Sequence, residues 1–462
     1  MKKITFLGGM IGCIFLSLIA CQSKQNTTEV QTELANPIIP GYFADPSIVQ
    51  HEGKFYLYAT ADPWGKEFLS CWVSDDLQNW TFNKLNWPTK EACTSPLSND
   101  NLVWAPSVIK KGNAFYMYVS VGSEVWCGKA DHPLGPWENM LQDEPLIPYD
   151  TTRYYHVIDA EAFIDEDGTP YLYWGSGWDW INGHCFAAEL NEDMCTFKSE
   201  WVEVTPEHFF EGALVNRVGD TYYLTYSAGV TMDDTYEVRY ATSKNPLGPF
   251  TEAANSPILK TNQELNVFGP GHHTIFSYLD KSYILYHRHR LPFITGTAYR
   301  QICINELIFD EETGTIQNII PHNSQLFPNL VKEKKAKIDP TQIETSSEQG
   351  QIYASTNVLD NSYATLWKPS LEDKAPFLLL SFEKGTSLQS MDIRFEYPWK
   401  TYYPKIEYQT KEKDWVLVAD YSQDGISGSP VTVDINQPTE QVRLSFPYPE
   451  KEETAIWTLT FE

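Results

Sequence analysis

Three acidic residues stand at the start of apolar, strand-like segments. Asp45 precedes Pro-Ser-Ile-Val, Asp159 precedes Ala-Glu-Ala-Phe-Ile, and Glu211 precedes Gly-Ala-Leu-Val. An unpaired carboxylate is costly to bury, so apolar strands rarely begin with one. Each acid alone could cap a turn, but the common position favours a shared chemical role. Convergent carboxylates suit hydrolysis of a glycosidic bond, in which one acid protonates the leaving oxygen and a second carboxylate activates water or attacks the sugar.

The third carboxylate and the nearby aromatic residues fit the same chemistry. A negative neighbour raises the pKa of a carboxyl group and keeps it protonated as an acid near neutral pH. Aromatic rings can stack on the apolar face of a sugar, although packing in the core is the alternative for each of them. The substrate-binding candidates beside the acidic strands are Phe43, Trp104 and Trp174, with Trp178, Trp180 and Phe210 also close in sequence.

Five hairpin-like units position these residues. Each unit has a short apolar strand, a polar turn that usually contains Gly or Asp, and a strand of alternating large residues, which is the signature of a β-hairpin. The segment Pro-Leu-Gly-Pro occurs in two of the units, at 133–136 and 246–249. Radial repetition of such units predicts a five-bladed β-propeller; unrelated hairpins in sandwiches are the alternative. Equivalent tyrosines, separated by 60, 55, 52 and 60 residues, are Tyr56, Tyr116, Tyr171, Tyr223 and Tyr283.

The predicted fold class is all-β, a five-bladed β-propeller followed by a β-sandwich. The propeller is expected over residues 37–330, and a charged linker follows at 331–340. Residues 341–462 again contain short apolar strands, among them Phe377–Phe382 and Val442–Phe446, which suits a small sandwich.

The N-terminal residues predict export and lipid anchoring. Two lysines precede an apolar run that ends at Ala20, and this order is typical of a signal peptide over residues 1–20. The sequence Leu-Ile-Ala-Cys21 resembles the lipobox of bacterial lipoproteins, which implies that Cys21 carries a lipid; an ordinary secretory signal is the alternative. Residues 21–36 are polar and suit a tether. The expected location is the bacterial cell envelope, lipid-anchored, on the periplasmic side or the cell surface.

The amino-acid composition limits the kinds of molecule that the protein is expected to bind. Asp and Glu number 61 against 34 Lys and Arg, a formal charge of −27, and this excess argues against nucleic acid, whose phosphates are bound by cations. An uncharged carbohydrate fits better, with the membrane reached only through the lipid anchor, and the chain is expected to be a monomer. Eight cysteines include Cys13 and Cys21 near the N-terminus. The other six permit disulfides in an exported protein, but their spacing selects no pairing.

The motifs around the acids closely resemble glycoside hydrolase family 43 over about residues 37–310. The resemblance implies a five-bladed propeller and hydrolysis with inversion. It further implies that Asp45 is the general base, Glu211 the general acid, and Asp159 the residue that orients the acid and tunes its pKa. One departure is Ala213, where the family usually has Pro. The motifs are Ala44-Asp45-Pro46-Ser47-Ile48, Val103-Trp104-Ala105-Pro106, Ile158-Asp159-Ala160-Glu161-Ala162-Phe163, Phe210-Glu211-Gly212 and Gly271-His272-His273 with Tyr286-His287.

The same resemblance implies roles for two basic residues, His272 and Arg300. His272 begins the fifth unit, where relatives place a histidine facing the propeller axis, often toward calcium. Calcium prefers oxygen ligands, so a hydrogen-bonded axial histidine is the alternative to a structural calcium site, and no cofactor is required for the chemistry. Arg300 corresponds to an arginine that reaches substrate in relatives; a surface role is the alternative.

The sequence therefore predicts an inverting, exo-acting glycosidase on pentose-containing plant-type polysaccharides or oligosaccharides, with α-L-arabinofuranosidase as the main hypothesis. The alternatives are β-xylosidase, endo-arabinanase and β-galactofuranosidase on the same fold, or a non-catalytic glycan-binding lipoprotein. The start of the sandwich, around Asn357–Trp367, resembles a discoidin-like module. That resemblance implies either carbohydrate binding or a purely structural appendage.

Overall fold

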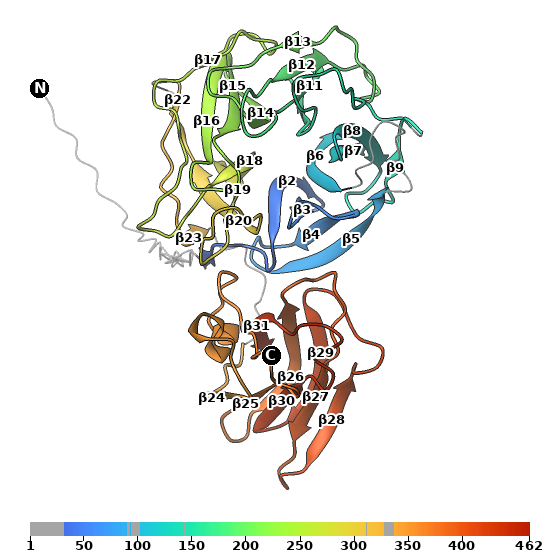
Figure 1. Cartoon of the computed structure of the whole chain (residues 1–462), viewed down its shortest axis with the longest axis vertical. Coiled ribbons are helices and arrows are strands. Elements are labelled where there is room, and N and C mark those ends of the chain that lie inside the picture. The colour runs from blue at the N-terminus through green and yellow to red at the C-terminus, as the bar shows by residue number, and fades with distance from the viewer. Residues whose placement is uncertain (1–31, 90–92, 94–101, 143, 311, 328–336) are drawn as a thin grey trace, which may run out of the picture.

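The computed structural model describes residues 32–89, 93, 102–142, 144–310, 312–327 and 337–462. The predicted signal peptide, Cys21 and most of the tether and linker lie outside these residues. The described part is almost entirely β-structure, and none of its helices is long and apolar enough to cross a membrane. Five sheets form a ring around a central axis, and further sheets lie beside the ring (Figure 1). The prediction of an all-β propeller followed by a sandwich is confirmed.

The first four sheets each have four antiparallel strands in chain order. This arrangement follows from consecutive hairpins, which leave only short sheet edges exposed to other chains. The strands are β2 (Phe43–His51), β3 (Lys54–Ala61), β4 (Phe68–Ser74) and β5 (Trp80–Thr89) in blade one; β6 (Val103–Lys111), β7 (Ala114–Val121), β8 (Glu124–Ala130) and β9 (Glu138–Asn139) in blade two; β10 (Glu161–Ile164), β11 (Pro170–Trp174), β12 (Phe186–Glu189) and β13 (Val202–Glu203) in blade three; and β14 (Glu211–Val218), β15 (Thr221–Ala228), β16 (Glu237–Ser243) and β17 (Thr251–Glu252) in blade four.

Blade five closes the ring. It contains β18 (Gly271–Tyr278), β19 (Lys281–His289) and β20 (Arg300–Leu307). The N-terminal segment completes its outer edge, because the N–H of Ile38 donates to the carbonyl of Ile302 at 2.9 Å. The side chain of Asn36 adds two hydrogen bonds to the backbone of Ile304. The start of the propeller is thereby fastened to its last blade.

Each innermost strand contains, or in blade three closely follows, one residue in the left-handed region of φ. This residue lies at or just before a register shift in four of the blades. A β-bulge bends a strand and redirects its side chains, and here the bend turns them toward the axis. A left-handed φ is strained for residues other than glycine, so the repetition marks a positioning device. The five residues are Asp45 (φ 52°), Ala105 (45°), Asp159 (58°), Gly212 (64°) and His272 (38°).

Hydrogen bonds tie four of these five residues to the preceding blade. The hydroxyls of Thr60, Ser120 and Ser227, all on second strands, accept the backbone N–H of Ala105, Asp159 and His272 at 2.8, 3.1 and 2.8 Å. The ring Nδ1 of His287 accepts the N–H of Asp45 at 3.4 Å and so joins blade five to blade one. The bulged residues therefore face the axis in fixed positions.

Buried aromatic and aliphatic side chains fill the space between neighbouring blades. Between blades one and two, for example, Tyr58 and Trp87 pack with Met117 and Trp126. A disulfide joins Cys127 of β8 to Cys195, which follows β12, and so links blade two to blade three. The cysteines Cys71, Cys93, Cys185 and Cys303 are buried and free.

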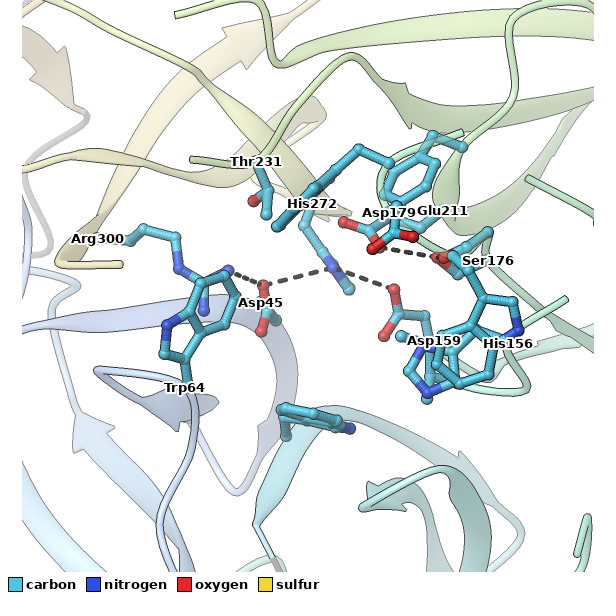
Figure 2. Close-up of a pocket in the computed structure, with 16 residues that line it drawn as sticks. Asp45, Trp64, His156, Asp159, Ser176, Asp179, Glu211, Thr231, His272 and Arg300 are labelled. Atoms are coloured by element: carbon cyan, nitrogen blue, oxygen red, sulfur yellow. Dashed lines mark hydrogen bonds and ion pairs between the residues drawn. The ribbon is translucent and has the colours of Figure 1, made fainter. Parts of the chain in front are cut away.

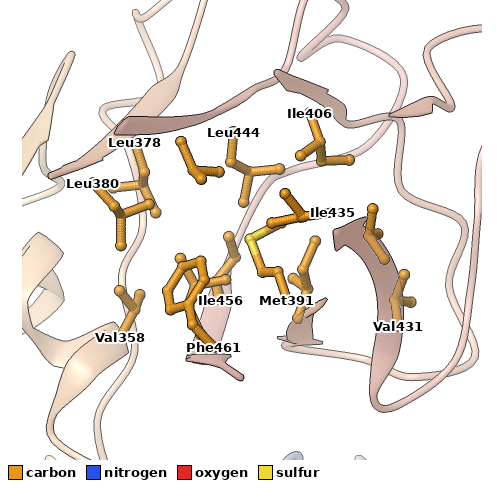
Figure 3. Packing of buried hydrophobic residues seen from close by; sticks show 14 of the residues in the cluster. Val358, Leu378, Leu380, Met391, Ile406, Val431, Ile435, Leu444, Ile456 and Phe461 are labelled. Carbon is orange, nitrogen blue, oxygen red and sulfur yellow. The ribbon is translucent and has the colours of Figure 1, made fainter. Parts of the chain in front are cut away.

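The C-terminal region is a sandwich of two sheets. One sheet has the order β24 (Gln342–Thr345), β25 (Phe377–Ser381), β30 (Gln441–Ser445), β27 (Lys405–Gln409) and β28 (Trp415–Asp420); the other has β29 (Val431–Pro438), β26 (Ser387–Phe395) and β31 (Ile456–Phe461). Its core consists of inward-facing residues of both sheets, including Leu380, Met391, Ile406, Leu444 and Phe461 (Figure 3). This alternation of buried and exposed positions is the expected pattern for strands with one face on a core.

Candidate active site

The three acids predicted from the sequence meet in one pocket on the propeller axis. The pocket has a volume of about 220 Å³, and Asp45, Asp159 and Glu211 line it together (Figure 2). They come from blades one, three and four. The pocket is also lined by Asp179, by the smaller side chains of Ile158, Ser176 and Thr231, by Gly177, and by a group of aromatic and basic residues. This group is Trp64, Trp104, His156, Trp178, Trp180, Phe210, His272 and Arg300.

Asp45 is held as an anion. Its Oδ1 lies 3.0 Å from Arg300 Nη1 and 3.4 Å from His272 Nδ1, and Thr60 donates its hydroxyl to Oδ2 at 2.7 Å. Burial alone would raise the pKa of Asp45, but Arg300, His272 and His287 hold that pKa well below its usual range. The carboxylate is therefore charged near neutral pH, and it can accept a proton from water.

Arg300 is itself fixed by a second carboxylate. Its backbone N–H and Nε donate to Asp62 Oδ2, both at 2.9 Å, and its Nη2 donates to Oδ1 at 2.8 Å. Asp62 is fully buried and Arg300 is 5% exposed. A guanidinium clamped in this bidentate manner has a fixed direction, so its remaining donor points at Asp45.

Glu211 has the opposite protonation behaviour. Tyr236 donates to its Oε1 at 2.7 Å, and Ser176 donates to Oε2 at 3.0 Å. Burial, with a contribution from the charge of Asp45, raises the pKa of Glu211 to about 7, although the two hydrogen bonds act in the opposite direction. Near neutral pH this carboxyl group can hold the proton that a general acid must deliver.

Asp159 and His272 complete the group. Burial and the negative charges of Glu211 and Asp45 raise the pKa of Asp159 well above its usual value. His272 stands between two acids, with its Nδ1 3.7 Å from Asp159 Oδ2 and 3.4 Å from Asp45 Oδ1 (Figure 2). Because interacting carboxyl groups in one pocket titrate as a pair, ionisation of either acid disfavours ionisation of the other.

Two of the predicted substrate-binding aromatics lie outside the pocket, and for them the prediction is wrong. Phe43 and Trp174 are fully buried. Phe43 packs edge-on against Trp72 at 5.4 Å, and Trp174 packs against Trp201 at 5.1 Å. Neither ring has a free face for a sugar, because both point into the packing between sheets. Trp104, Trp178, Trp180, Phe210 and Arg300 do line the pocket, as does His272.

The sequence suggested that the three acids occupy equivalent positions in their blades, but Glu211 lies one residue before the position equivalent to Asp45 and Asp159. The left-handed residue of blade four is Gly212, which matches Asp45 and Asp159, while Glu211 precedes it. The pairing of β14 with β15 confirms the offset, since Asn216 faces Tyr223 four residues after Gly212, as Val49 faces Tyr56 four residues after Asp45. Glu211 thus corresponds to Trp104 of blade two, which also lines the pocket.

Several site residues were not found from the sequence. Trp64, 37% exposed, lies between β3 and β4 and lines the pocket beside Arg300 at 5.8 Å. Tyr236 and Ser176 lie in loops, where no strand pattern indicates their direction. Asp62 could have been found, because it follows the apolar strand β3 without a break and a buried carboxylate there requires a cation.

The donor set does not fit a tight calcium site. Asp159, Glu211 and His272 each place one donor atom within 4.8 Å of the others. Calcium takes roughly 6–8 oxygen ligands, whereas this group offers two carboxylates and one nitrogen, and Glu211 already accepts hydrogen bonds from Tyr236 and Ser176. The observed contacts of His272 are those of an axial histidine between acids, and we derive no step through a metal ion.

Known proteins that are similar to this chain are glycosidases, as the convergent acids suggest. Residues 34–314 match the model of a family described as glycosyl hydrolases family 43. A β-D-galactofuranosidase from Aspergillus niger is 34% identical over 316 residues, which cover 64% of this chain and 89% of that protein. An arabinoxylan arabinofuranohydrolase from Bacillus subtilis is 27% identical over 364 residues, 66% of this chain and 69% of that protein.

A solved structure titled "Glycoside hydrolase" extends the similarity to the sandwich. It has a TM-score of 0.78 at 25% identity and covers 93% of this chain and 99% of its own. The discoidin-like resemblance of the sandwich stays a prediction. Through its family match, its relatives and the convergent acids on its axis, the chain belongs to glycosyl hydrolase family 43 and is an inverting glycosidase.

Proposed function

We propose that the protein is an exo-acting furanosidase that removes terminal α-L-arabinofuranosyl residues from plant-type glycans. The observation that carries this proposal is the size of the axial pocket. Its volume of about 220 Å³ is below the roughly 300–1,000 Å³ of sites for drug-sized ligands, which suits a single sugar ring at the acids better than an extended chain.

Terminal β-D-galactofuranosides are the second candidate substrates. The relative at 34% identity is a β-D-galactofuranosidase, and another at 27% acts on arabinoxylan as an arabinofuranohydrolase. The two sugars have the same ring configuration and differ in the exocyclic chain at C4. One arrangement of acids therefore suits both, and the space around that chain decides between them.

The proposed mechanism assigns one step to each acid. Asp45 accepts a proton from the attacking water, while Glu211 protonates the leaving oxygen on the opposite face of the ring, so the anomeric configuration inverts. Arg300 fixes the direction of Asp45 through its 3.0 Å contact. Asp159 sustains the proton affinity of Glu211. The reaction requires no cofactor.

The mouth of the pocket offers a platform for the leaving group. Trp178 is 40% exposed, and its ring stacks on His156 at 4.2 Å and 20°. The N–H of Ile181 donates to the Trp178 carbonyl, which forms a tight turn with Asp179 and Trp180 at positive φ. Strained turns of this kind concentrate at functional sites. We place the leaving-group sugar, which is joined to the cleaved residue by the scissile bond, on the Trp178 ring.

A substrate screen tests the proposal. Purified protein is assayed with aryl α-L-arabinofuranoside, aryl β-D-galactofuranoside and aryl β-D-xyloside, and proton NMR identifies the first anomer released. We expect fastest turnover of the arabinofuranoside and inversion. Preference for the xyloside would overturn the furanosidase proposal. Hydrolysis of none of the three would overturn the proposed substrate class.

A further inference from the structure

The C-terminal sandwich packs against blades one and five. The sandwich lies directly beside these blades (Figure 1). A buried cluster at the contact combines Tyr42 of the propeller with Leu366 and Trp457 of the sandwich. Trp399 packs edge-on against Phe43 at 5.6 Å. Buried aromatic contacts of this kind are typical of permanent interfaces, so the sandwich is not a freely moving module.

A series of hydrogen bonds leads from the sandwich to Asp45. Glu396, at the end of β26 and 4% exposed, accepts the hydroxyl of Tyr42 at 3.1 Å. The carbonyl of Tyr42 accepts the backbone N–H of Asp62 at 3.0 Å. Asp62 clamps Arg300, and Arg300 donates to Asp45 at 3.0 Å. Every bond in the series is buried.

A second set of contacts holds Arg300 from its own strand. Tyr299, the residue before it, packs on Tyr42 at 5.0 Å and lies under the guanidinium of Arg290 at 4.4 Å. Gln301, the residue after it, donates to the carbonyl of Tyr363 in the sandwich at 2.6 Å. Both chain neighbours of Arg300 therefore depend on the interface.

We propose that the sandwich positions the Asp45–Arg300 pair, and that Glu396 is a positioning residue for the general base although it lies in the other domain. Lys368 donates to both oxygens of Glu396 at 2.7 and 2.9 Å, so the acceptor of the Tyr42 hydroxyl is fixed in turn. The proposal rests on the glycosidase activity of the site and not on which sugar is cleaved.

The test removes one atom at the interface. Tyr42→Phe deletes the hydroxyl and keeps the ring, and Lys368 still neutralises Glu396, so the variant should fold. We expect kcat to fall about tenfold with KM nearly unchanged, because small displacements of reacting groups can cost up to about 10²-fold in rate. Glu396→Gln keeps an acceptor for Tyr42 and should lose less than Glu396→Ala.

The matched control is Tyr223→Phe. Tyr223 is 3% exposed, its hydroxyl donates to the Gly314 carbonyl at 3.2 Å, and its ring packs in a different buried cluster from that of the interface. This variant should keep the kcat of the wild type. An unchanged kcat in Tyr42→Phe and Glu396→Ala would overturn the proposal, and so would an equal loss in Tyr223→Phe.

A crystal structure of Tyr42→Phe gives a second readout that needs no substrate. If the proposal is correct, the 3.0 Å contact between Arg300 Nη1 and Asp45 Oδ1 lengthens or breaks. A contact that stays intact would overturn it. A wild-type protein that hydrolyses no substrate would contradict the proposed function, whereas this structural measurement would still decide the positioning role.

Discussion

Asp45 and Glu211 carry the same chemical group in one pocket, yet their neighbours give them opposite proton affinities. Asp45 faces a guanidinium and two imidazoles, and these hold its pKa well below the usual range. Glu211 faces neutral hydroxyls, and burial raises its pKa to about 7. At neutral pH one carboxyl group is ionised while the other can retain a proton. Acid–base hydrolysis needs this division of roles.

The first prediction concerns the acid. Glu211→Gln removes the proton donor, so turnover of a natural disaccharide should fall by about 10²–10⁴-fold. The leaving group of an activated aryl glycoside needs little protonation, so turnover of this substrate should fall much less. The measurement is kcat/KM on both substrates. Asp45→Asn is the comparison, because loss of the base should reduce kcat/KM on both substrates. If Glu211→Gln reduced kcat/KM equally on both substrates, Glu211 would not be the general acid.

The second prediction concerns Asp159. The ionised forms of Asp159 and Glu211 repel each other in one pocket. Asp159→Asn removes this repulsion, so the pKa of Glu211 should fall from about 7. Because catalysis uses the protonated form of Glu211, activity is lost as the pH rises through this pKa. The basic limb of the kcat/KM profile should therefore move to lower pH. A limb that stays in place or moves to higher pH would contradict the assigned role.

At the scale of residues, sequence reasoning located charged groups better than aromatic ones. A carboxylate at the start of an apolar strand is informative because burying it alone is costly, and the three acids do line one pocket. Phe43 and Trp174 gave no such signal, since an aromatic ring is equally suited to core and to sugar. Their burial between sheets depends on neighbours that are distant in sequence.

The blade is the element that makes the site. Five left-handed residues, four of them at register shifts, turn their neighbours toward the axis, and hydrogen bonds from preceding blades fix four of the five. The hairpin repeat could be predicted because turns and alternating strands are local features. The offset of Glu211 could not, because Gly212 rather than an acid adopts the left-handed conformation, and only strand register reveals which residue does so.

The third prediction concerns the link between blades two and three. The Cys127–Cys195 disulfide closes a long segment, with a sequence separation of 68, and such bonds typically contribute about 2–4 kcal/mol by restricting the unfolded chain. Cys127→Ala combined with Cys195→Ala should lower the free energy of unfolding by that amount in urea titrations. Dithiothreitol should destabilise the wild type and leave the double variant unchanged. An effect of the reductant on both would place the stabilising disulfide elsewhere.

At the scale of the whole molecule, the sequence predicts a propeller and a sandwich joined by a charged linker, and this suggests two independent parts. The structure shows an interface between the two. At this interface Tyr42 of the propeller packs with Trp457 of the sandwich, and Trp399 of the sandwich packs against the propeller. Aromatic residues on the two contacting surfaces have the same sequence signature as core residues. Their role at an interface therefore becomes visible only when both domains are in place.

The last prediction concerns the place of this molecule in the cell, and it follows from the lipobox-like sequence that ends at Cys21 and the polar segment after it. If Cys21 carries a lipid, Cys21→Ser should release the protein from membranes into the soluble fraction, because the polar body then has no anchor. Cys13→Ser is the matched control, since it changes a thiol within the same leader and should leave the protein on the membrane. Fractionation and immunoblotting provide the measurement. A Cys21→Ser protein that remains membrane-bound like the wild type would exclude the lipid anchor.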